Sequence, residues 1–190
     1  MTGESNDRPV DRSRAALRML QLALLLFAAL LTAQAHAWFW NAPSWADIDE
    51  SIARDHPGLP SIEIAQLRDW LNDPARPRPL LVDARSREEY DVSHLPGAVH
   101  AESVDALRSR LTQHDGPVVV YCSVGVRSAR LAKDLLASGV TKVSNLRGSI
   151  FAWANHGWPL ERAGGPTAQV HPFNRRWGTL LDQSHWSHEP

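Results

Sequence analysis

The stretch VVVYCSVGVRSARLAKDLL, residues 118 to 136, decides how the fold of this chain is interpreted. Three consecutive valines and a tyrosine lead into Cys122, the single cysteine among 190 residues. This run is typical of a buried strand, and the apolar spacing from about Ser128 onward indicates a helix that ends at Gly139. Cys122 therefore stands where a strand ends and the loop to a helix begins.

Strands and helices are expected to alternate on both sides of this stretch. We expect strands within 80–83, 93–101, 117–122 and 140–146, and helices within 62–71, 86–90, 103–111, 128–139 and 149–157. Ser86 and Glu89 have the spacing of a capping box at the start of the helix within 86–90. Alternation of this kind predicts an α/β domain with a mainly parallel sheet and helices on both faces. Ligands of open parallel sheets bind outside the carboxyl ends of the strands, which is where Cys122 is expected.

The first 37 residues have the pattern of an export signal. Arginines precede an apolar run over 19–31, and Ala35 and Ala37 follow with the spacing of an A-x-A cleavage site. We therefore expect a signal peptide over 1–37 and a periplasmic or secreted mature chain. The alternative is an uncleaved membrane anchor with the domain outside the cytoplasm, in which Trp38 and Trp40 would lie at the membrane surface.

The rest of the chain divides into three segments. Residues 38–60 are expected to be an irregular, Trp-rich lead-in because prolines and glycines gather in HPGLP, and residues 61–163 form the α/β domain. Residues 164–190 are a C-terminal tail whose apolar side chains follow helical spacing, so we expect a helix that packs back on the domain. The alternative for this tail is a docking surface for a partner. Its apolar side chains are Phe173, Trp177, Leu180 and Leu181.

Composition excludes several classes of site. The formal net charge of −1 gives no overall field to attract nucleic acid, so no nucleic-acid partner is expected. One cysteine excludes an intramolecular disulfide and a CxxC motif. His185 and His188 have no further ligands nearby in the sequence, so no metal is expected, and no cofactor is implied.

The loop after Cys122 has the features of an anion site. Gly125 permits the positive φ of a tight loop, and successive amide groups can then point inward. The partial positive charge of the following helix and the full charge of Arg127 act at the same place. Together they should stabilise a thiolate and a second bound anion. The expected binding residues of this loop are Ser123, Val124, Gly125, Val126, Arg127 and Ser128.

Three motifs together resemble the rhodanese family of sulfurtransferases. The loop Cys122 to Arg127 resembles the family's active-site loop, C-x-x-G-x-R. LLVDARSREEYDVSHLPGAVHA resembles its first signature, and VSNLRGSIFAWANHGWPLE resembles its closing segment, with Ser149 where the family has a second glycine. The resemblance covers about residues 62 to 161 and implies a five-stranded parallel sheet flanked by helices.

The resemblance also implies an activity. Cys122 would take a sulfane sulfur from a donor such as thiosulfate, a persulfide or a polysulfide, and pass it to a thiophilic acceptor, which a protein thiol could be. The loop amides would hold the persulfide, and Asp83 and Arg85 would lie near the pocket floor, with Arg85 toward a donor's oxygens. His94, in the family's His-x-Pro-Gly motif, is interpreted as structural. Because this loop holds one basic residue, a persulfide, polysulfide or protein donor suits it better than thiosulfate.

Two other classes of function use a similar cysteine. Phosphatases and arsenate reductases of related fold need the longer loop C-x5-R, whereas Cys122 to Arg127 is C-x4-R. The second class is a non-catalytic module that docks a partner or senses redox state or persulfides, because an exposed reactive thiol is readily oxidised. Measured turnover would distinguish a sulfurtransferase from such a module.

Overall fold

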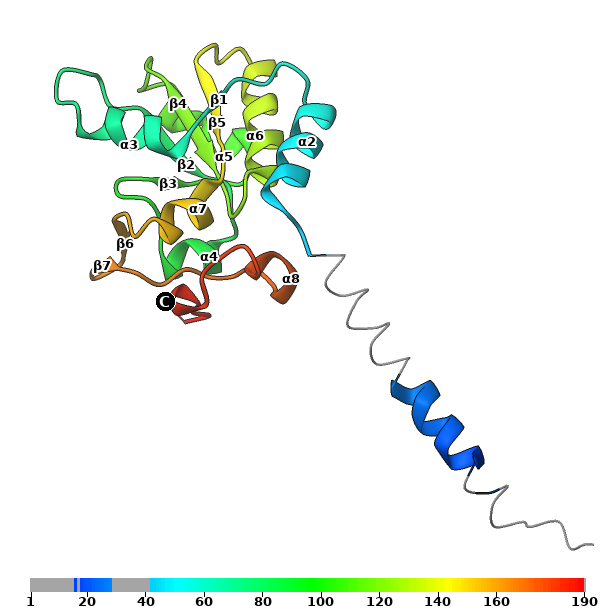
Figure 1. Cartoon of the computed structure of the whole chain (residues 1–190). Helices are drawn as coiled ribbons and strands as arrows, with labels where there is room; N and C mark the ends of the chain where they lie inside the picture. The colour runs from blue at the N-terminus through cyan, green and yellow to red at the C-terminus, as the bar shows by residue number, and fades with distance from the viewer. Residues whose placement is uncertain (1–15, 17, 29–41, 190) are drawn as a thin grey trace, which may run out of the picture. The chain divides into compact units, whose positions relative to one another are not determined.

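The computed structural model describes residues 16, 18–28 and 42–189 (Figure 1). The chain forms two compact units, Met1–Ala42 and Pro43–Pro190. In the first unit, residues 18–28 are helical. Ala35, Ala37, Trp38 and Trp40 lie outside the described residues, so the cleavage site stays a prediction. Within the described parts of the chain, every helix is too short or too polar to cross a membrane.

The second unit is built on a five-stranded sheet in which all neighbours are parallel. Its order is β1-β5-β4-β2-β3. The five strands are β1 (Ser61–Ile62), β2 (Leu80–Asp83), β3 (Val99–His100), β4 (Val118–Tyr121) and β5 (Val143–Leu146). Asp83 lies opposite Tyr121, so β2 and β4 end level at the edge where Cys122 follows. The predicted α/β class and parallel sheet are therefore confirmed.

Helices cover both faces of this sheet (Figure 1). α5 (Val104–Leu111) and α6 (Val126–Ala137) pack on one face. The apolar side chains that meet there include Leu107, Leu131 and Leu135 from the helices and Val118 and Val120 from β4. α3 (Ile64–Asn72) and α7 (Ser149–Asn155) pack on the other face, where the second core cluster lies. α4 (Arg87–Val92) follows β2 and lies at the end of the domain that also holds the C-terminal tail.

The lead-in is not irregular, because α2 (Trp45–Asp55) occupies much of it. The Ser44 side chain caps this helix by accepting a hydrogen bond from the Asp47 amide at 3.1 Å. Ile48 is buried and Ile52 is partly buried, one turn apart on the face that packs against the domain. The capping residue and this spacing are signals of a helix in the sequence. The irregular lead-in was predicted because of the prolines and glycines that follow the helix.

The tail packs on the domain as predicted, but it is not one continuous helix. β6 (Leu160–Arg162) and β7 (Gly165–Thr167) form an antiparallel hairpin, followed by the short α8 (Arg175–Gly178) and the 3-10 helix η1 (Gln183–His185). Gly178 allows close packing, since a Cβ there would lie 2.7 Å from the Trp186 ring. Val170 and Leu181 are buried in the core cluster beside α7, whereas Phe173 is exposed.

Candidate active site

Cys122 lies directly after β4, at the carboxyl edge of the sheet, and its residue is 1% exposed. Its sulfur accepts a hydrogen bond from the backbone N–H of Gly125 at 3.2 Å. Gly125 is the N-cap of the 12-residue α6, which begins at Val126, two residues before the predicted start. The first N–H groups of a helix have no carbonyl partner within the helix. Those at the start of α6 are therefore available to donate hydrogen bonds near the sulfur. The sensing alternative assumed an exposed thiol. That assumption is wrong, because the thiol is buried.

The turn that aims this amide at the sulfur requires a glycine. Gly125 has φ of 111°, in the left-handed region where a side chain is strained. A Cβ at this position would lie 3.3 Å from the Ile52 side chain of α2. Thus α2 closes the back of the cysteine loop, which the sequence did not indicate.

Arg127 braces the loop through the carboxylate of Glu89, a residue whose place in the sequence indicates only a helix cap. Its two terminal nitrogens donate to Glu89 Oε2 at 2.7 Å and Glu89 Oε1 at 2.8 Å. The second nitrogen also donates to Ser123 Oγ at 2.9 Å, and Ser123 Oγ donates to Glu89 at 3.1 Å. Glu89 keeps its predicted capping box with Ser86 as well. Its contact with Arg127, 38 residues away, has no local sequence signal.

The charges of this pair stabilise each other. Burial by itself would raise the pKa of Glu89, but the hydrogen bonds and the charge of Arg127 lower it to about 2. Burial opposes the charge of Arg127 too, yet hydrogen bonding to Glu89 raises its pKa above the usual value. Both groups are therefore ionised at neutral pH, and their charges cancel at the rim of the loop.

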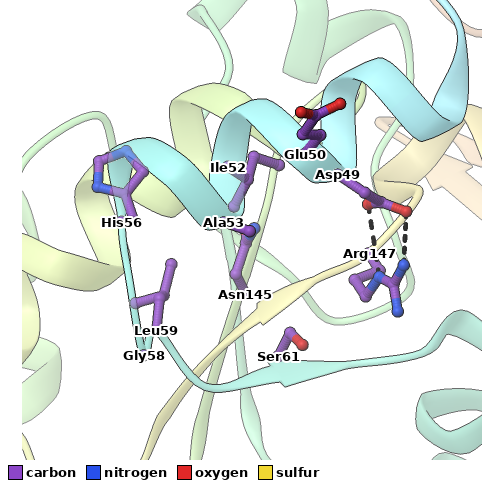
Figure 2. Close-up of a pocket in the computed structure, with 10 residues that line it drawn as sticks. All are labelled: Asp49, Glu50, Ile52, Ala53, His56, Gly58, Leu59, Ser61, Asn145 and Arg147. Carbon is purple, nitrogen blue, oxygen red and sulfur yellow. Dashed lines mark hydrogen bonds and ion pairs between the residues drawn. The ribbon is translucent and has the colours of Figure 1, made fainter.

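Asn145 of β5 holds the same loop through hydrogen bonds. Its Nδ2 donates to the carbonyl of Gly125 at 3.0 Å, and its Oδ1 accepts from Ser128 Oγ at 2.7 Å. Figure 2 shows Asn145 beside Ile52 in a pocket of about 450 Å³ between α2, β1 and β5. Arg147, paired with Asp49, lies at one end of this pocket. Cys122 is not among the residues that line this pocket.

The first turn of α7 holds the backbone of the cysteine. Ile150 donates to the Cys122 carbonyl at 3.1 Å, and Phe151 donates to the Ser123 carbonyl at 3.1 Å. The hydroxyl of Ser149 accepts from the Cys122 N–H at 3.2 Å. The sequence marks Ser149 only as a departure from the family's glycine and gives no signal for this contact.

Asp83 and Arg85 form a fully buried ion pair, each side chain 0% exposed. Arg85 donates to Asp83 through two nitrogens and to the carbonyl of Ser93. Burial alone would lower the pKa of Arg85, but the Asp83 carboxylate raises it, so the guanidinium stays charged. The pair ties the end of β2 to the segment after α4. This geometry favours a structural role, and the donor contact predicted for Arg85 stays a prediction.

His94, Trp153 and Trp158 occupy structural positions. The His94 ring stacks on Tyr90 with centroids 3.8 Å apart, and its backbone bridges to Glu161. Trp153 is buried in the core and meets the edge of Trp158. In the parts of the chain that the structure describes, no three His, Cys, Asp or Glu side chains lie close enough together to hold a metal ion.

Comparison of the sequence with known proteins gives the family of this chain. The family model of the rhodanese-like domain matches residues 63–156. A protein named sulfurtransferase from Allochromatium vinosum is 38% identical over 82 residues, which are 43% of this chain and 77% of that relative. The chain belongs to the rhodanese-like domain family. A tRNA sulfurtransferase of Desulfurococcus amylolyticus is 41% identical over 71 residues, 37% of this chain but only 14% of that longer protein.

Solved structures confirm the rhodanese-like fold. The thiosulfate sulfurtransferase of Pseudomonas aeruginosa superposes with a TM-score of 0.52 and 24% identity, over 74% of this chain and 26% of that one. The BH2092 protein of Bacillus halodurans gives a TM-score of 0.52 and 22% identity, over 64% of this chain and 89% of that one.

Proposed function

We propose that this rhodanese-like protein is a sulfurtransferase that carries a sulfane sulfur as a persulfide of Cys122. The observation that carries the proposal is the hydrogen bond from the Gly125 amide to the cysteine sulfur at 3.2 Å, at the start of α6. An amide and a helix start beside a sulfur stabilise its anion, and the thiolate is the nucleophilic form of cysteine.

The reaction needs no oxidant or cofactor. The Cys122 thiolate attacks the outer sulfur of a persulfide anion, forming one S–S bond while the donor's own S–S bond breaks and its thiolate leaves. In the second step an acceptor thiolate attacks the terminal sulfur of the Cys122 persulfide, which restores the Cys122 thiolate. Each step exchanges one S–S bond for another and conserves the total charge.

The charges around the loop favour a donor whose reacting end carries a single negative charge, as a persulfide does, over a compact dianion. Arg127 is neutralised by Glu89, and the buried Arg85 is neutralised by Asp83. A dianion such as thiosulfate therefore meets little net positive charge. The side chains of Val126 and Phe173 are exposed, 39% and 42%, and Phe173 lies against Arg127 with 4.6 Å between guanidinium carbon and ring centre. This rim suits the organic part of a persulfide or of a protein thiol acceptor.

The export signal predicted over 1–37 belongs to the same proposal. A chain with an export signal would carry out sulfur transfer outside the cytoplasm, in the periplasm or the medium. Burial of Cys122 suits an oxidising compartment, since a thiol shielded by its loop is less open to oxidation.

The test is steady-state sulfur transfer by the full chain from glutathione persulfide or thiosulfate to a thiol acceptor. We expect turnover with the persulfide, a kcat/KM about tenfold lower with thiosulfate, and no turnover for Cys122→Ser. Equal activity of wild type and Cys122→Ser would contradict the proposed function. Equal kcat/KM for the two donors would contradict the donor preference alone.

A further inference from the structure

Ser149 has a backbone conformation that its residue type disfavours. Its φ is +48°, and it is one of two residues other than glycine with positive φ in the described chain. The preceding Gly148 is also left-handed, with φ of +69°. Glycine adopts this region without strain, whereas a serine does not. Strain of this kind persists only where surrounding contacts compensate for it.

The side chain of Ser149 supplies two such contacts, and both are buried. Ser149 is 0% exposed, its hydroxyl donates to the carbonyl of Leu146 at 3.0 Å, and it accepts the Cys122 N–H at 3.2 Å. The hydroxyl therefore links the end of β5 to the backbone of the nucleophile. A glycine here would relieve the strain but leave the Cys122 N–H without this partner.

The peptide groups on both sides of Cys122 are held by fixed partners. Ser149 binds its N–H, Ile150 donates to its carbonyl, and the Tyr121 carbonyl before it accepts from Ala84 at 2.8 Å. With the backbone fixed, the direction of the Cα–Cβ bond is fixed, and the sulfur meets the Gly125 amide. The serine hydroxyl has no hydrogen bond to the sulfur itself, so it would act through the backbone.

We infer that Ser149 is a positioning residue for Cys122, whose hydroxyl orients the peptide group of the nucleophile so that its sulfur faces the Gly125 amide. This inference rests on the proposed function, because it concerns the same sulfur transfer. It explains why a strained serine occupies a turn where glycine would be easier to accommodate.

The variant that tests the inference is Ser149→Gly in the full chain. It removes the hydroxyl and the strain together, so the relief of strain offsets part of the cost of the unpaired Cys122 N–H, and the protein should melt within a few degrees of the wild type. We expect kcat for persulfide formation to fall about tenfold while KM for glutathione persulfide changes by less than about twofold. Loss of a purely structural hydrogen bond would not lower kcat at unchanged melting temperature and unchanged KM.

Two further variants sharpen the result. Ser149→Ala removes the hydroxyl but keeps a strained Cβ, so it should share the kinetic defect and also melt lower than Ser149→Gly. Ser138→Ala is the matched control, because its hydroxyl donates to the Leu135 carbonyl at 2.7 Å near the far end of α6. It should leave kcat unchanged. Wild-type kcat in Ser149→Gly, or an equal fall in Ser138→Ala, overturns the inference.

Alkylation of Cys122 by excess iodoacetamide separates this inference from the proposed function, because it needs no sulfur donor. If the wild type forms no persulfide, the proposed function fails, and the alkylation rates then decide the role of Ser149. A slower rate in both Ser149 variants than in the wild type and Ser138→Ala supports positioning. An unchanged rate, or failure of the wild-type thiol to react, overturns it.

Discussion

Glu89 and Arg127 form a bidentate ion pair, with nitrogen–oxygen distances of 2.7 and 2.8 Å, between the first turn of α4 and the first turn of α6. The Glu89 side chain is 3% exposed and that of Arg127 is 35% exposed. The carboxylate therefore lies beneath the guanidinium, where it also accepts from Ser123. This arrangement fixes the cysteine loop and removes its net positive charge, and both consequences can be measured.

Replacing Glu89 should change the donor preference. Glu89→Gln leaves the charge of Arg127 uncompensated beside the loop, so kcat/KM for thiosulfate should rise about fivefold relative to that for glutathione persulfide. Glu88→Gln, on the exposed side of the same helix, is the matched control and should not change this ratio. An unchanged ratio in Glu89→Gln would show that the charge of this pair does not determine the donor.

The same substitution should change the response of the protein to acid. The folded pKa of Glu89 is about 2, below the usual 4.5, so its stabilisation is complete above about pH 4.5 and is lost as the pH falls toward 2. At neutral pH that shift corresponds to roughly 3 kcal/mol. The stability difference between wild type and Glu89→Gln, from urea unfolding, should be constant above about pH 5 and shrink as the pH falls from there toward 2. A difference that is constant with pH would contradict the ionised pair.

Gly125 should be intolerant of a side chain for two reasons. Gly125→Ala places a Cβ at φ of 111° and 3.3 Å from Ile52, so we expect a loss of about 1–2 kcal/mol in stability and of the amide contact to the sulfur. Gly139→Ala has a comparable backbone strain at φ of 98° but open space around it, at the far end of α6. Both variants should melt lower, and only Gly125→Ala should lose most of its sulfur transfer. Equal activities would contradict the role of the loop.

The tail should contribute to stability. Ending the chain after Thr167 removes Val170 and Leu181, which are 0% and 3% exposed, and should cost about 3 kcal/mol or more of unfolding free energy. Phe173→Ala, at an exposed position where the ring lies against Arg127, should cost about 1 kcal/mol or less. Urea unfolding of the two variants checks this difference. An unchanged midpoint in the truncated chain would mean that the tail does not stabilise the domain.

Local patterns in the sequence were enough for most of the fold. The apolar runs before Asp83 and Cys122 predicted buried parallel strands, and the capping box of Ser86 and Glu89 predicted the start of α4. α2 was missed although Ser44 marks its start, because the turn-forming residues after it outweighed its helical spacing. The tail was predicted as one helix because its apolar spacing is helical, but close packing of Gly178 against Trp186 belongs to a compact, broken chain.

Only part of the site was predictable, because some of its residues lie far apart in the sequence. Cys122, Gly125 and Arg127 lie in one loop, so their proximity follows from the sequence. Glu89 and Ser149 reach that loop from α4 and α7, 38 and 27 residues away along the chain. No spacing rule links such residues, since only the packing of α4 and α7 at one edge of the sheet brings them to the cysteine.

The most direct measurement is the intact mass of the full chain after exposure to glutathione persulfide, beside Cys122→Ser treated identically. We predict that the wild type gains the mass of one sulfur atom, that the gain is absent in Cys122→Ser, and that a thiol acceptor removes it. A wild type that gains no sulfur, or a Cys122→Ser variant that gains as much, would contradict the persulfide chemistry assigned to Cys122.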